Sequence, residues 1–243
     1  MTVNAEVSET GPLSGRVAVV TGGTSGIGAA ACEVLARLGA RVVAAGRRAH
    51  PDAPGNPAIT RVAADVRSYD DMERLRDTAI STYGGLDIVV ANAGLADWGG
   101  LVDDDPHRWQ PVIETNVLGA ALVLRATLPH LVAQGHGHVV IVSSISGRTA
   151  YAGEPIYIST KFALVGLGRS LRKEVAGKGI RVTLIEPGIV DTPVSSTEEG
   201  RRELSELRAL TPANVADAIG FAVSAPANVN IDELVLTPVA QTL

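Results

Sequence analysis

Hydrophobic positions along the chain fall into two kinds of segment. Short runs rich in β-branched residues alternate with longer stretches in which apolar residues recur at helical spacing. The short runs predict strands at residues 17–21, 41–45, 59–63, 87–91, 138–143, 180–186 and 234–238. The longer stretches predict helices at residues 27–38, 68–83, 106–133, 155–176 and 212–223.

The expected strands are apolar throughout instead of alternating between apolar and polar residues, so they need helices on both faces. This pattern predicts an α/β chain with a doubly wound, Rossmann-type fold and a seven-stranded parallel sheet. No proline- or glycine-rich linker divides residues 16–243, so we expect one domain there. Residues 1–15 are polar and are expected to form a flexible N-terminal arm. Residues 190–210 break the alternation with a charged stretch, which we interpret as a mobile segment that covers the substrate.

Composition narrows the classes of function. The 243-residue chain has a formal net charge of −5 and no cluster of Lys and Arg, so we expect no nucleic-acid partner. No apolar run reaches the roughly 18 residues of a membrane-spanning helix, and the N-terminus lacks the basic start and apolar middle of a secretory signal. Cys32 is the only cysteine, which excludes an internal disulfide and fits a reducing compartment. We therefore expect a cytoplasmic protein with no membrane partner.

Glycines cluster directly after the first expected strand. Residues 21–28, with the sequence TGGTSGIG, lead into an alanine-rich helical pattern. Gly22 allows a tight exit from the strand, Gly26 lets the backbone approach phosphates, and the helix N-terminus offers free N–H groups to a pyrophosphate. An ordinary tight turn is the alternative interpretation, since the spacing is not G-x-G-x-x-G. The expected cofactor contacts of this turn are Gly22, Thr24, Ser25, Gly26, Ile27 and Gly28.

The end of the second expected strand bears on the cofactor's phosphate. Folds that bind NAD commonly place Asp or Glu there, to hold the ribose 2′-hydroxyl. Here the strand ends at Gly46 and is followed by Arg47 and Arg48, whose guanidinium groups could bind a 2′-phosphate. The alternative is two arginines that simply flank a surface loop. The sequence favours NADP(H) over NAD(H).

Candidate chemistry lies after the fifth strand and in the next helix. Tyr157 and Lys161 are four residues apart and therefore share one helical face. A nearby ammonium is expected to lower the pKa of the Tyr157 phenol toward the working pH, so that Tyr157 acts as a general acid or base. Ser144 follows a strand end, where its hydroxyl could hold a substrate oxygen. Taken alone, a Tyr-x-x-x-Lys pair is weak evidence.

Together, residues 21–28, Asn92-Ala93-Gly94, Asn116, Ser144 and the Tyr157/Lys161 pair resemble the short-chain dehydrogenase/reductase family in its single-domain form. The resemblance runs from Leu13 to the end of the chain, and five ordered motifs make it specific. The C-terminal run 226–241 is similar to the NADP-dependent branch that contains 3-hydroxy acid dehydrogenases and the clavulanate-pathway aldehyde reductase.

The resemblance implies further roles. Asp65 and Val66 would hold the adenine ring, and Asn92, Ala93 and Gly94 would form the turn that supports the sheet beside the cofactor. Asn116 would connect Lys161 to solvent through a water, and Lys161 would also hold the nicotinamide ribose. The segment Pro187, Gly188 and Ile189, with Thr192, would meet the nicotinamide carboxamide. The implied catalytic residues are thus Asn116, Ser144, Tyr157 and Lys161, and no metal is expected.

Substrate contacts are expected from loops that follow strand ends on the cofactor side, namely at Trp98, Ser146, Tyr151 and Glu154. Trp98 could equally be a loop residue that packs against a neighbouring subunit. Because only 3% of the residues are aromatic, the site is not expected to stack flat polycyclic substrates.

These observations predict an NADP(H)-dependent oxidoreductase that reduces a ketone or aldehyde of a small molecule, or oxidises the corresponding alcohol. The alternative is a non-catalytic redox sensor that binds NADP(H). Dehydration or epimerisation would generally need a longer C-terminal substrate domain. A purely structural subunit stays open because relatives commonly form homotetramers; we expect a homotetramer or a homodimer.

Overall fold

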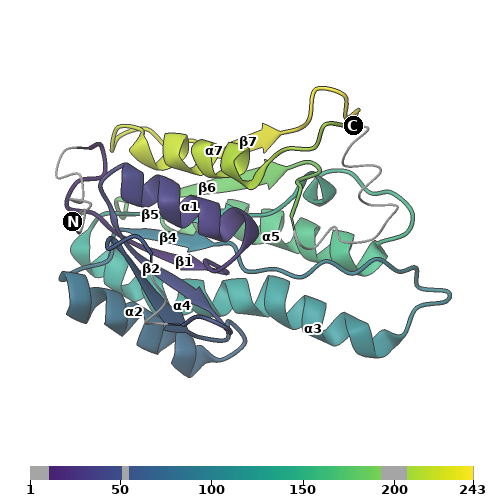
Figure 1. Ribbon diagram of the computed structural model, residues 1–243, viewed down its shortest axis with the longest axis horizontal. Coiled ribbons are helices and arrows are strands. Elements are labelled where there is room, and N and C mark those ends of the chain that lie inside the picture. The colour runs from purple at the N-terminus through teal and green to yellow at the C-terminus, as the bar shows by residue number, and fades with distance from the viewer. Residues whose placement is uncertain (1–10, 51–54, 193–206, 243) are drawn as a thin grey trace, which may run out of the picture.

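Seven parallel strands form one sheet at the centre of the molecule (Figure 1). The computed structural model describes residues 11–50, 55–192 and 207–242. The sheet has the order β3-β2-β1-β4-β5-β6-β7. The strands are β1 Val17–Thr21, β2 Arg41–Gly46, β3 Ile59–Ala63, β4 Ile88–Ala91, β5 Gly137–Val142, β6 Ile180–Pro187 and β7 Glu233–Leu236. The predicted doubly wound fold and the seven-stranded parallel sheet are confirmed.

Helices cover both faces of the sheet, as the apolar strands require (Figure 1). On one face lie α1 Gly26–Arg37 and α7 Pro212–Ser224. On the other face lie α2 Tyr69–Tyr83, α4 Gly119–Gln134 and α5 Pro155–Glu174. Each layer has its own hydrophobic core, so every central strand is buried from both sides.

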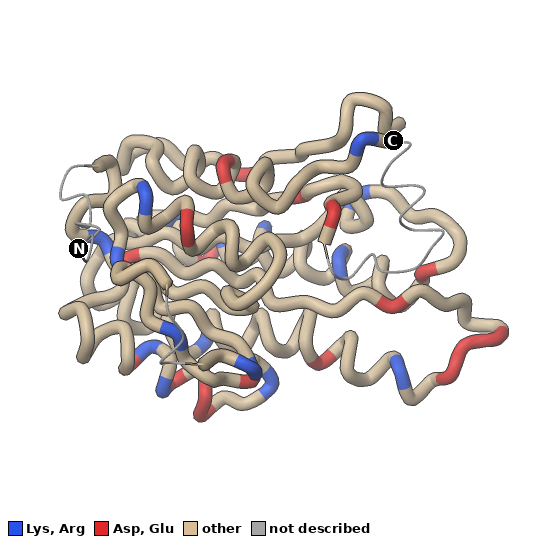
Figure 2. The backbone as a smooth tube through the Cα atoms, in the orientation of Figure 1, with Lys and Arg blue, Asp and Glu red and all other residues tan. Residues whose placement is uncertain are grey.

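Charged residues are absent from three central strands of the sheet. The strands β1, β4 and β5 contain no Lys, Arg, Asp or Glu, and Figure 2 shows their tube in tan. Acidic and basic positions are mixed around the ends of β2 and α2. A strand that is buried on both faces has no place for an unpaired charge, which explains why these sequences are apolar.

The helical stretch that precedes β5 is not one regular helix. It begins with the 3₁₀ turn η1 Pro106–Arg108 and the short helix α3 Trp109–Ile113, continues as the π-helical turn η2 Glu114–Leu118, and ends with α4. The stretch Pro106–Gln134 is long and apolar enough to cross a membrane. However, α4 packs against α2 and the sheet, so it is a core helix.

Leu13 belongs to the core of the domain, although a flexible arm is expected at residues 1–15. The flexible arm was expected to include residues 11–15, but Leu13 is only 3% exposed and its N–H donates to Leu38 O at 3.0 Å. That prediction was wrong for these residues, because Leu13 fills the core under α1; residues 1–10 lie outside the described residues. Most of the expected cover at 190–210 also lies outside them, since residues 193–206 are not described.

The strand order places the site. Neighbouring strands β1 and β4 lead into connections on opposite sides of the sheet, since β1 continues toward β2 and β4 toward β5. Such a reversal opens a crevice beyond the carboxyl ends of the strands. The residues that follow β1, β4, β5 and β6 therefore meet there.

Candidate active site

The glycine-rich turn after β1 leaves an open helix N-terminus. Gly22 has a φ of 65°, and a Cβ on Gly28 would lie 2.2 Å from Gly22 O, so both positions require glycine. Ser25 is the N-cap residue of α1, but its side chain makes no capping hydrogen bond, and the first turn of α1 has no acidic residue. The first N–H groups of α1 are thus available to a ligand, and the turn fits a pyrophosphate.

Asn92 and Ala93 fix this turn against the neighbouring strand. The Asn92 side-chain Nδ2 donates to Thr21 O at 2.9 Å, and the backbone N–H groups of Asn92 and Ala93 donate to Thr21 Oγ1 at 3.1 and 3.2 Å. These contacts join Asn92 and Ala93 to the end of β1. A Cβ at position 28 would also lie only 2.5 Å from Asn92 Nδ2.

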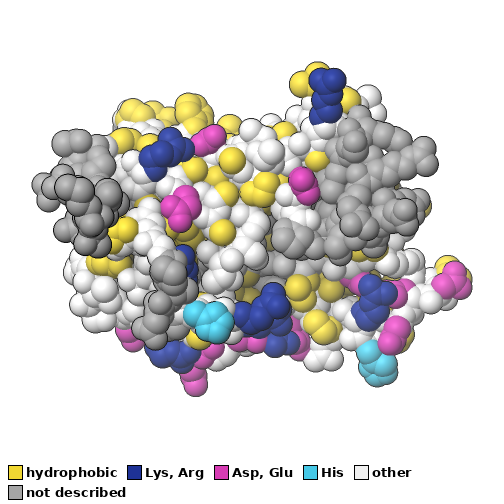
Figure 3. Space-filling view, viewed as in Figure 1, with side chains coloured by type: hydrophobic (Ala, Val, Ile, Leu, Met, Phe, Trp, Pro, Cys, Tyr) yellow, Lys and Arg dark blue, Asp and Glu magenta, His cyan; other side chains and the backbone are white. Residues whose placement is uncertain are grey.

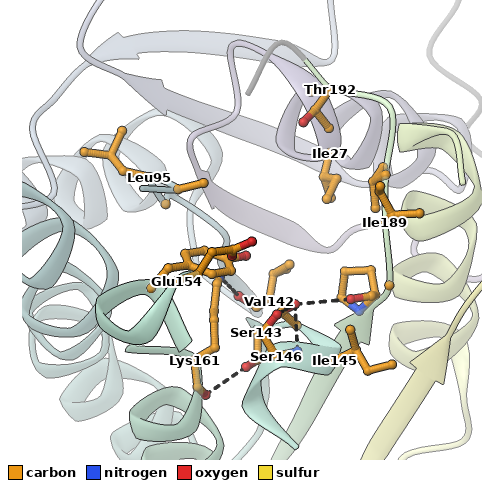
Figure 4. Close-up of a pocket in the computed structure, with 18 of the residues that line it drawn as sticks. Ile27, Leu95, Val142, Ser143, Ile145, Ser146, Glu154, Lys161, Ile189 and Thr192 are labelled. Carbon is orange, nitrogen blue, oxygen red and sulfur yellow. Dashed lines mark hydrogen bonds between the residues drawn. The ribbon is translucent and has the colours of Figure 1, made fainter. Parts of the chain in front are cut away.

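A cleft of about 580 Å³ lies beyond these strand ends, and Figure 4 shows part of its lining. Most of the predicted site residues line it: Gly22, Ser25, Gly26, Ile27, Asn92, Ala93, Gly94, Trp98, Ser144, Ser146, Tyr151, Glu154, Tyr157, Lys161, Pro187, Gly188, Ile189 and Thr192. The predicted residues that do not line it are Thr24, Gly28, Arg47, Arg48, Asp65, Val66 and Asn116.

Ser144 is held at the mouth of β5 by a network of short-range contacts. It is the N-cap of the 3₁₀ turn η3 Ile145–Gly147, and its Oγ accepts from Ser146 N at 3.1 Å. The same Oγ donates toward Ser146 Oγ at 3.2 Å or Pro187 O at 3.4 Å. The Ser144 hydroxyl is therefore oriented by η3 and β6, and Ser144 lines the cleft.

Tyr157 and Lys161 project from one face of α5 into the cleft, as their spacing predicts. Lys161 Nζ lies 5.5 Å from the centre of the Tyr157 ring and 3.5 Å from Val142 O. Lys161 is buried, and this burial lowers its pKa to about 8.

The expected lowering of the Tyr157 pKa does not occur in the protein alone. Burial raises the pKa of Tyr157, and a hydrogen bond with Ser144 opposes this rise without cancelling it. The charges of Tyr151 and Glu154 add to the rise. Desolvation is the largest of these effects, so Tyr157 holds its proton and is set up as a proton donor.

Asn116 lies in the π-helical turn η2 and is fully buried. Its Oδ1 accepts from Leu95 N at 2.7 Å, while its Nδ2 donates to Leu95 O at 2.8 Å and to Thr160 Oγ1 at 3.0 Å. These contacts tie the loop after β4 to α5, next to Lys161. The structure thus gives Asn116 a positioning role behind the cleft wall.

The four expected substrate residues all line the cleft. Ser146 Oγ and Tyr151 OH form a hydrogen bond of 2.5 Å, and Glu154 immediately precedes α5. Trp98 lines the cleft and is 50% exposed. Its loop is held by ion pairs, because Arg108 binds Asp97 at 2.5 Å and Asp104 at 3.0 Å.

The residues expected to meet the adenosine end lie outside this cleft. Arg47 and Arg48 are exposed at the end of β2. Figure 3 shows basic side chains on the lower part of this face, where β2 and α2 end. The Asp65 carboxylate accepts hydrogen bonds from Arg67, which hold the pKa of Asp65 at about 2, and Arg47 lowers it slightly further. Val66 is buried against Gly119.

Sequence reasoning missed several residues of the cleft. Gln241 comes from the C-terminal segment, and its Oε1 accepts from Ile189 N at 3.0 Å. This contact occupies the amide that was expected to meet the nicotinamide carboxamide. Gln241 lies in the C-terminal run that carries the resemblance to the NADP-dependent branch, but no site role was expected for it, so only the folded chain reveals its place in the cleft. The other unpredicted lining residues are Leu95, Ala96, Val142, Ser143, Ile145, Thr149, Val190 and Thr242.

An ion-pair network that runs from the surface to the buried Glu186 lies behind the floor of the cleft. Glu186, at the end of β6, is fully buried, and its Oε2 binds Arg148 Nε at 2.6 Å. Arg148 also pairs with Glu233, which Arg169 binds at 2.6 Å. The network joins the segment after Ser144 to the strand that ends at Pro187.

Comparisons with known proteins agree with this geometry. The family model described as short chain dehydrogenase matches residues 16–203. An uncharacterized oxidoreductase of Staphylococcus epidermidis is 37% identical over 229 residues, which cover 92% of this chain and 97% of that protein. One of Staphylococcus haemolyticus is 37% identical over 233 residues, covering 93% and 99%.

Solved structures give the same result. The closed form of serine dehydrogenase complexed with NADP+ superposes with a TM-score of 0.86 at 32% identity, over 93% of this chain and 96% of that one. A 3-ketoacyl-(acyl-carrier-protein) reductase from Brucella melitensis complexed with NADH has a TM-score of 0.84 at 27% identity, over 94% and 99%.

Proposed function

The chain belongs to the short-chain dehydrogenase family and is an oxidoreductase, and from that premise we propose that it reduces a small ketone or aldehyde with NADPH. Oxidation of the corresponding alcohol is the same reaction in reverse. The observation that carries this proposal is the meeting of Ser144, Tyr157 and Lys161 in one cleft with the open N-terminus of α1.

The residues that would hold the cofactor follow the cleft. Gly22, Ser25, Gly26 and Ile27 would bind the pyrophosphate through backbone N–H groups at the start of α1. Lys161, Ile189 and Thr192 would hold the nicotinamide end, with Asn92, Ala93, Gly94, Pro187 and Gly188 as the adjoining wall, while Asp65 and Val66 would contact the adenine. When bound, the nicotinamide exchanges the hydride with the carbonyl carbon.

Tyr157 completes the reaction at the substrate oxygen. In reduction its phenol gives a proton to the oxygen on which negative charge develops, and in oxidation it takes the proton back. Ser144 donates its hydroxyl hydrogen to the same oxygen and stabilises that charge. The raised pKa of Tyr157, caused first by burial, favours the protonated phenol and hence the direction of reduction.

The choice of NADP(H) rests on Arg47, with Arg48 as its neighbour. Asp or Glu is missing from the end of β2, and both arginines are exposed where a 2′-phosphate would lie. The charge of Arg47 also acts on Asp65, which supports a role of Arg47 close to the expected adenine site. The NADP+ complex of serine dehydrogenase supports this choice, although the NADH complex of the ketoacyl reductase represents the alternative.

Membership of the branch with 3-hydroxy acid dehydrogenases and aldehyde reductases is part of the proposal, as are the cytoplasmic location and assembly as a homotetramer or homodimer. Exposed apolar side chains at Ile113, Leu118 and Phe162 on the helical layer support an assembly.

The experiment is a turnover assay of the purified protein with NADPH and a panel of small neutral ketones and aldehydes, followed by nicotinamide absorbance. Tyr157→Phe serves as the matched control. Cofactor consumption that needs both a carbonyl compound and Tyr157 supports the proposal. Tight NADPH binding without turnover of any carbonyl compound or alcohol would favour the alternative, a non-catalytic redox sensor.

A further inference from the structure

Few charged side chains face the cleft. Among the described residues that line it, the charged side chains are Lys161 and Glu154. Lys161 is 7% exposed, and its Nζ lies 5.5 Å from the centre of the Tyr157 ring and 3.5 Å from Val142 O, so its charge is held beside the proposed proton donor. Glu154 is therefore the one acidic side chain among the described lining residues, and it is nearly as buried as Lys161.

Glu154 is positioned to act on a substrate. It is 9% exposed, it is the N-cap residue of α5, and its side chain makes no capping hydrogen bond. Figure 4 places it on the same wall as Lys161, across the pocket from Ile27 and Ile189. The N-terminal end of α5 favours a negative charge at this position. Burial raises the pKa of Tyr157, and the Glu154 charge adds to that rise, so this carboxylate acts on the reacting phenol.

We propose that Glu154 sets the substrate class: carbonyl compounds that carry a protonated amine are preferred, and those that carry a carboxylate are rejected. The inference rests on the proposed reductase function and names the substrate of that same site. A carboxylate in a partly desolvated cleft attracts a cation and repels an anion much more strongly than it would in bulk water. The described lining offers hydroxyl groups, at Ser146, Thr149 and Tyr151 among others, and no arginine to a substrate carboxylate.

Glu154 would distinguish two classes of substrate, namely those with a carboxylate and those with an amine. A hydroxy acid or keto acid would place its carboxylate beside Glu154, at a cost in binding. An amino ketone or amino aldehyde would pair with Glu154 while its carbonyl oxygen meets Ser144 and Tyr157. The reaction itself is unchanged: the carbonyl carbon gains a hydride, the oxygen gains a proton, and the amine keeps its charge.

The test uses amino ketones and keto acids of two matched chain lengths. Aminoacetone is compared with pyruvate, and 4-aminobutan-2-one with acetoacetate, each by kcat/KM with NADPH in the wild type and in Glu154→Gln. Dividing the amine-to-acid ratio of the wild type by that of the variant cancels the intrinsic reactivity of each carbonyl. We expect this quotient to be at least ~10 for one of the two chain lengths. A tenfold effect requires only a small part of the interaction energy of a charge pair in a partly buried site. The preference should persist in high salt.

Asp103→Asn is the matched control. It removes one negative charge from an exposed position outside the cleft lining, and its amine-to-acid ratio should equal that of the wild type. A quotient within ~2 of unity for Glu154→Gln at both lengths would overturn the inference. Failure of the reductase proposal would look different, because neutral aldehydes and ketones would then be inert as well.

Loss of folding in Glu154→Gln does not prevent the test. The wild type is then assayed with a neutral ketone in the presence of butylamine or butyrate. Competitive inhibition by the amine, at a concentration ~10-fold below that needed for the acid, supports the inference. Equal inhibition, or tighter binding of butyrate, contradicts it.

Discussion

The nicotinamide end and the adenosine end of the candidate cofactor site hold their charged groups in opposite ways. At the nicotinamide end, Tyr157 and Lys161 sit inside the protein, and burial is the main cause that shifts the pKa of each. At the adenosine end, Arg47 and Arg48 are exposed, and the pKa of Asp65 is lowered mainly by its hydrogen bond with Arg67.

The two ends therefore differ in how strongly their charged groups depend on packing and on salt. A pKa that is shifted by desolvation depends on packing and changes little with salt, whereas exposed charge pairs are screened within about 10 Å at 0.1 M ionic strength. The chemical step is therefore built into the core of the fold. The choice between NADP(H) and NAD(H) depends on surface side chains that substitution can change without disturbing the core.

The largest effect is expected at the nicotinamide end. Tyr157→Phe removes the proton donor and should lower kcat by at least ~100-fold, the usual loss for a general acid. Affinity for NADPH, measured by quenching of tryptophan fluorescence, should stay unchanged because the ring and its packing remain. Near-normal turnover in this variant would remove Tyr157 from the reaction.

Lys161→Met tests the cost of burial at the same end. The pKa of Lys161 falls from the ordinary 10.5 to about 8, so below pH 8 both the folded and the unfolded protein carry the proton and the buried charge destabilises the fold fully. Between pH 8 and 10.5 only the unfolded chain keeps the proton, and the penalty disappears as pH rises. The variant should thus be more stable at pH 7 by up to about 3 kcal/mol, although inactive, with a gain that vanishes near pH 10.5.

Denaturant unfolding of the cofactor-free protein at several pH values measures this effect. Lys173→Met is the control, because Lys173 lies on the same helix but is exposed. A Lys161→Met variant that is less stable than the wild type at pH 7, or whose gain does not change with pH, would show that Lys161 is not a strained buried charge.

A smaller effect is expected at the adenosine end. Arg47→Asp should weaken NADPH binding by ~10-fold or more and leave NADH binding unchanged or tighter, because the carboxylate repels a 2′-phosphate and accepts from a 2′-hydroxyl. The loss should shrink in high salt, unlike any effect at Lys161. Arg48→Asp is the matched comparison, with a smaller loss. Equal loss for both cofactors would show that Arg47 does not read the 2′-phosphate.

The smallest effect is expected for Asp65→Asn. Its ion pair with Arg67 is largely exposed, so the change in the free energy of unfolding should not exceed ~1 kcal/mol at pH 7. The pKa of Asp65 is lowered to about 2, so the contribution is present above pH ~4 and is lost as pH falls toward 2. Unfolding at low and high salt checks this, and a loss that survives in high salt would contradict the comparison.

The same contrast explains what the sequence could predict. Strand positions follow from continuous apolar runs, and Ser144, Tyr157 and Lys161 meet because strand ends and helical spacing dictate it. Local patterns carry this information, so the sequence alone predicts the fold and the meeting of Ser144, Tyr157 and Lys161.

Features that depend on tertiary packing could not be predicted. The π-helical turn at Asn116 has no signal in a continuous helical pattern, and Gln241 reaches Ile189 only because β7 returns the chain end to the cleft. The direction of the Tyr157 pKa shift was also missed, since the spacing of Lys161 is visible in the sequence while the burial that raises the pKa of Tyr157 is not. The pair of Arg148 and Glu186 likewise joins residues 38 positions apart.

A crystal structure of the protein with NADP+ tests the central claim most directly. The account predicts the pyrophosphate on the N-terminus of α1, the nicotinamide beside Tyr157 and Lys161, and the 2′-phosphate within hydrogen-bonding distance of the Arg47 guanidinium. A nicotinamide away from Tyr157, or a 2′-phosphate that faces solvent without contact to Arg47, would contradict it.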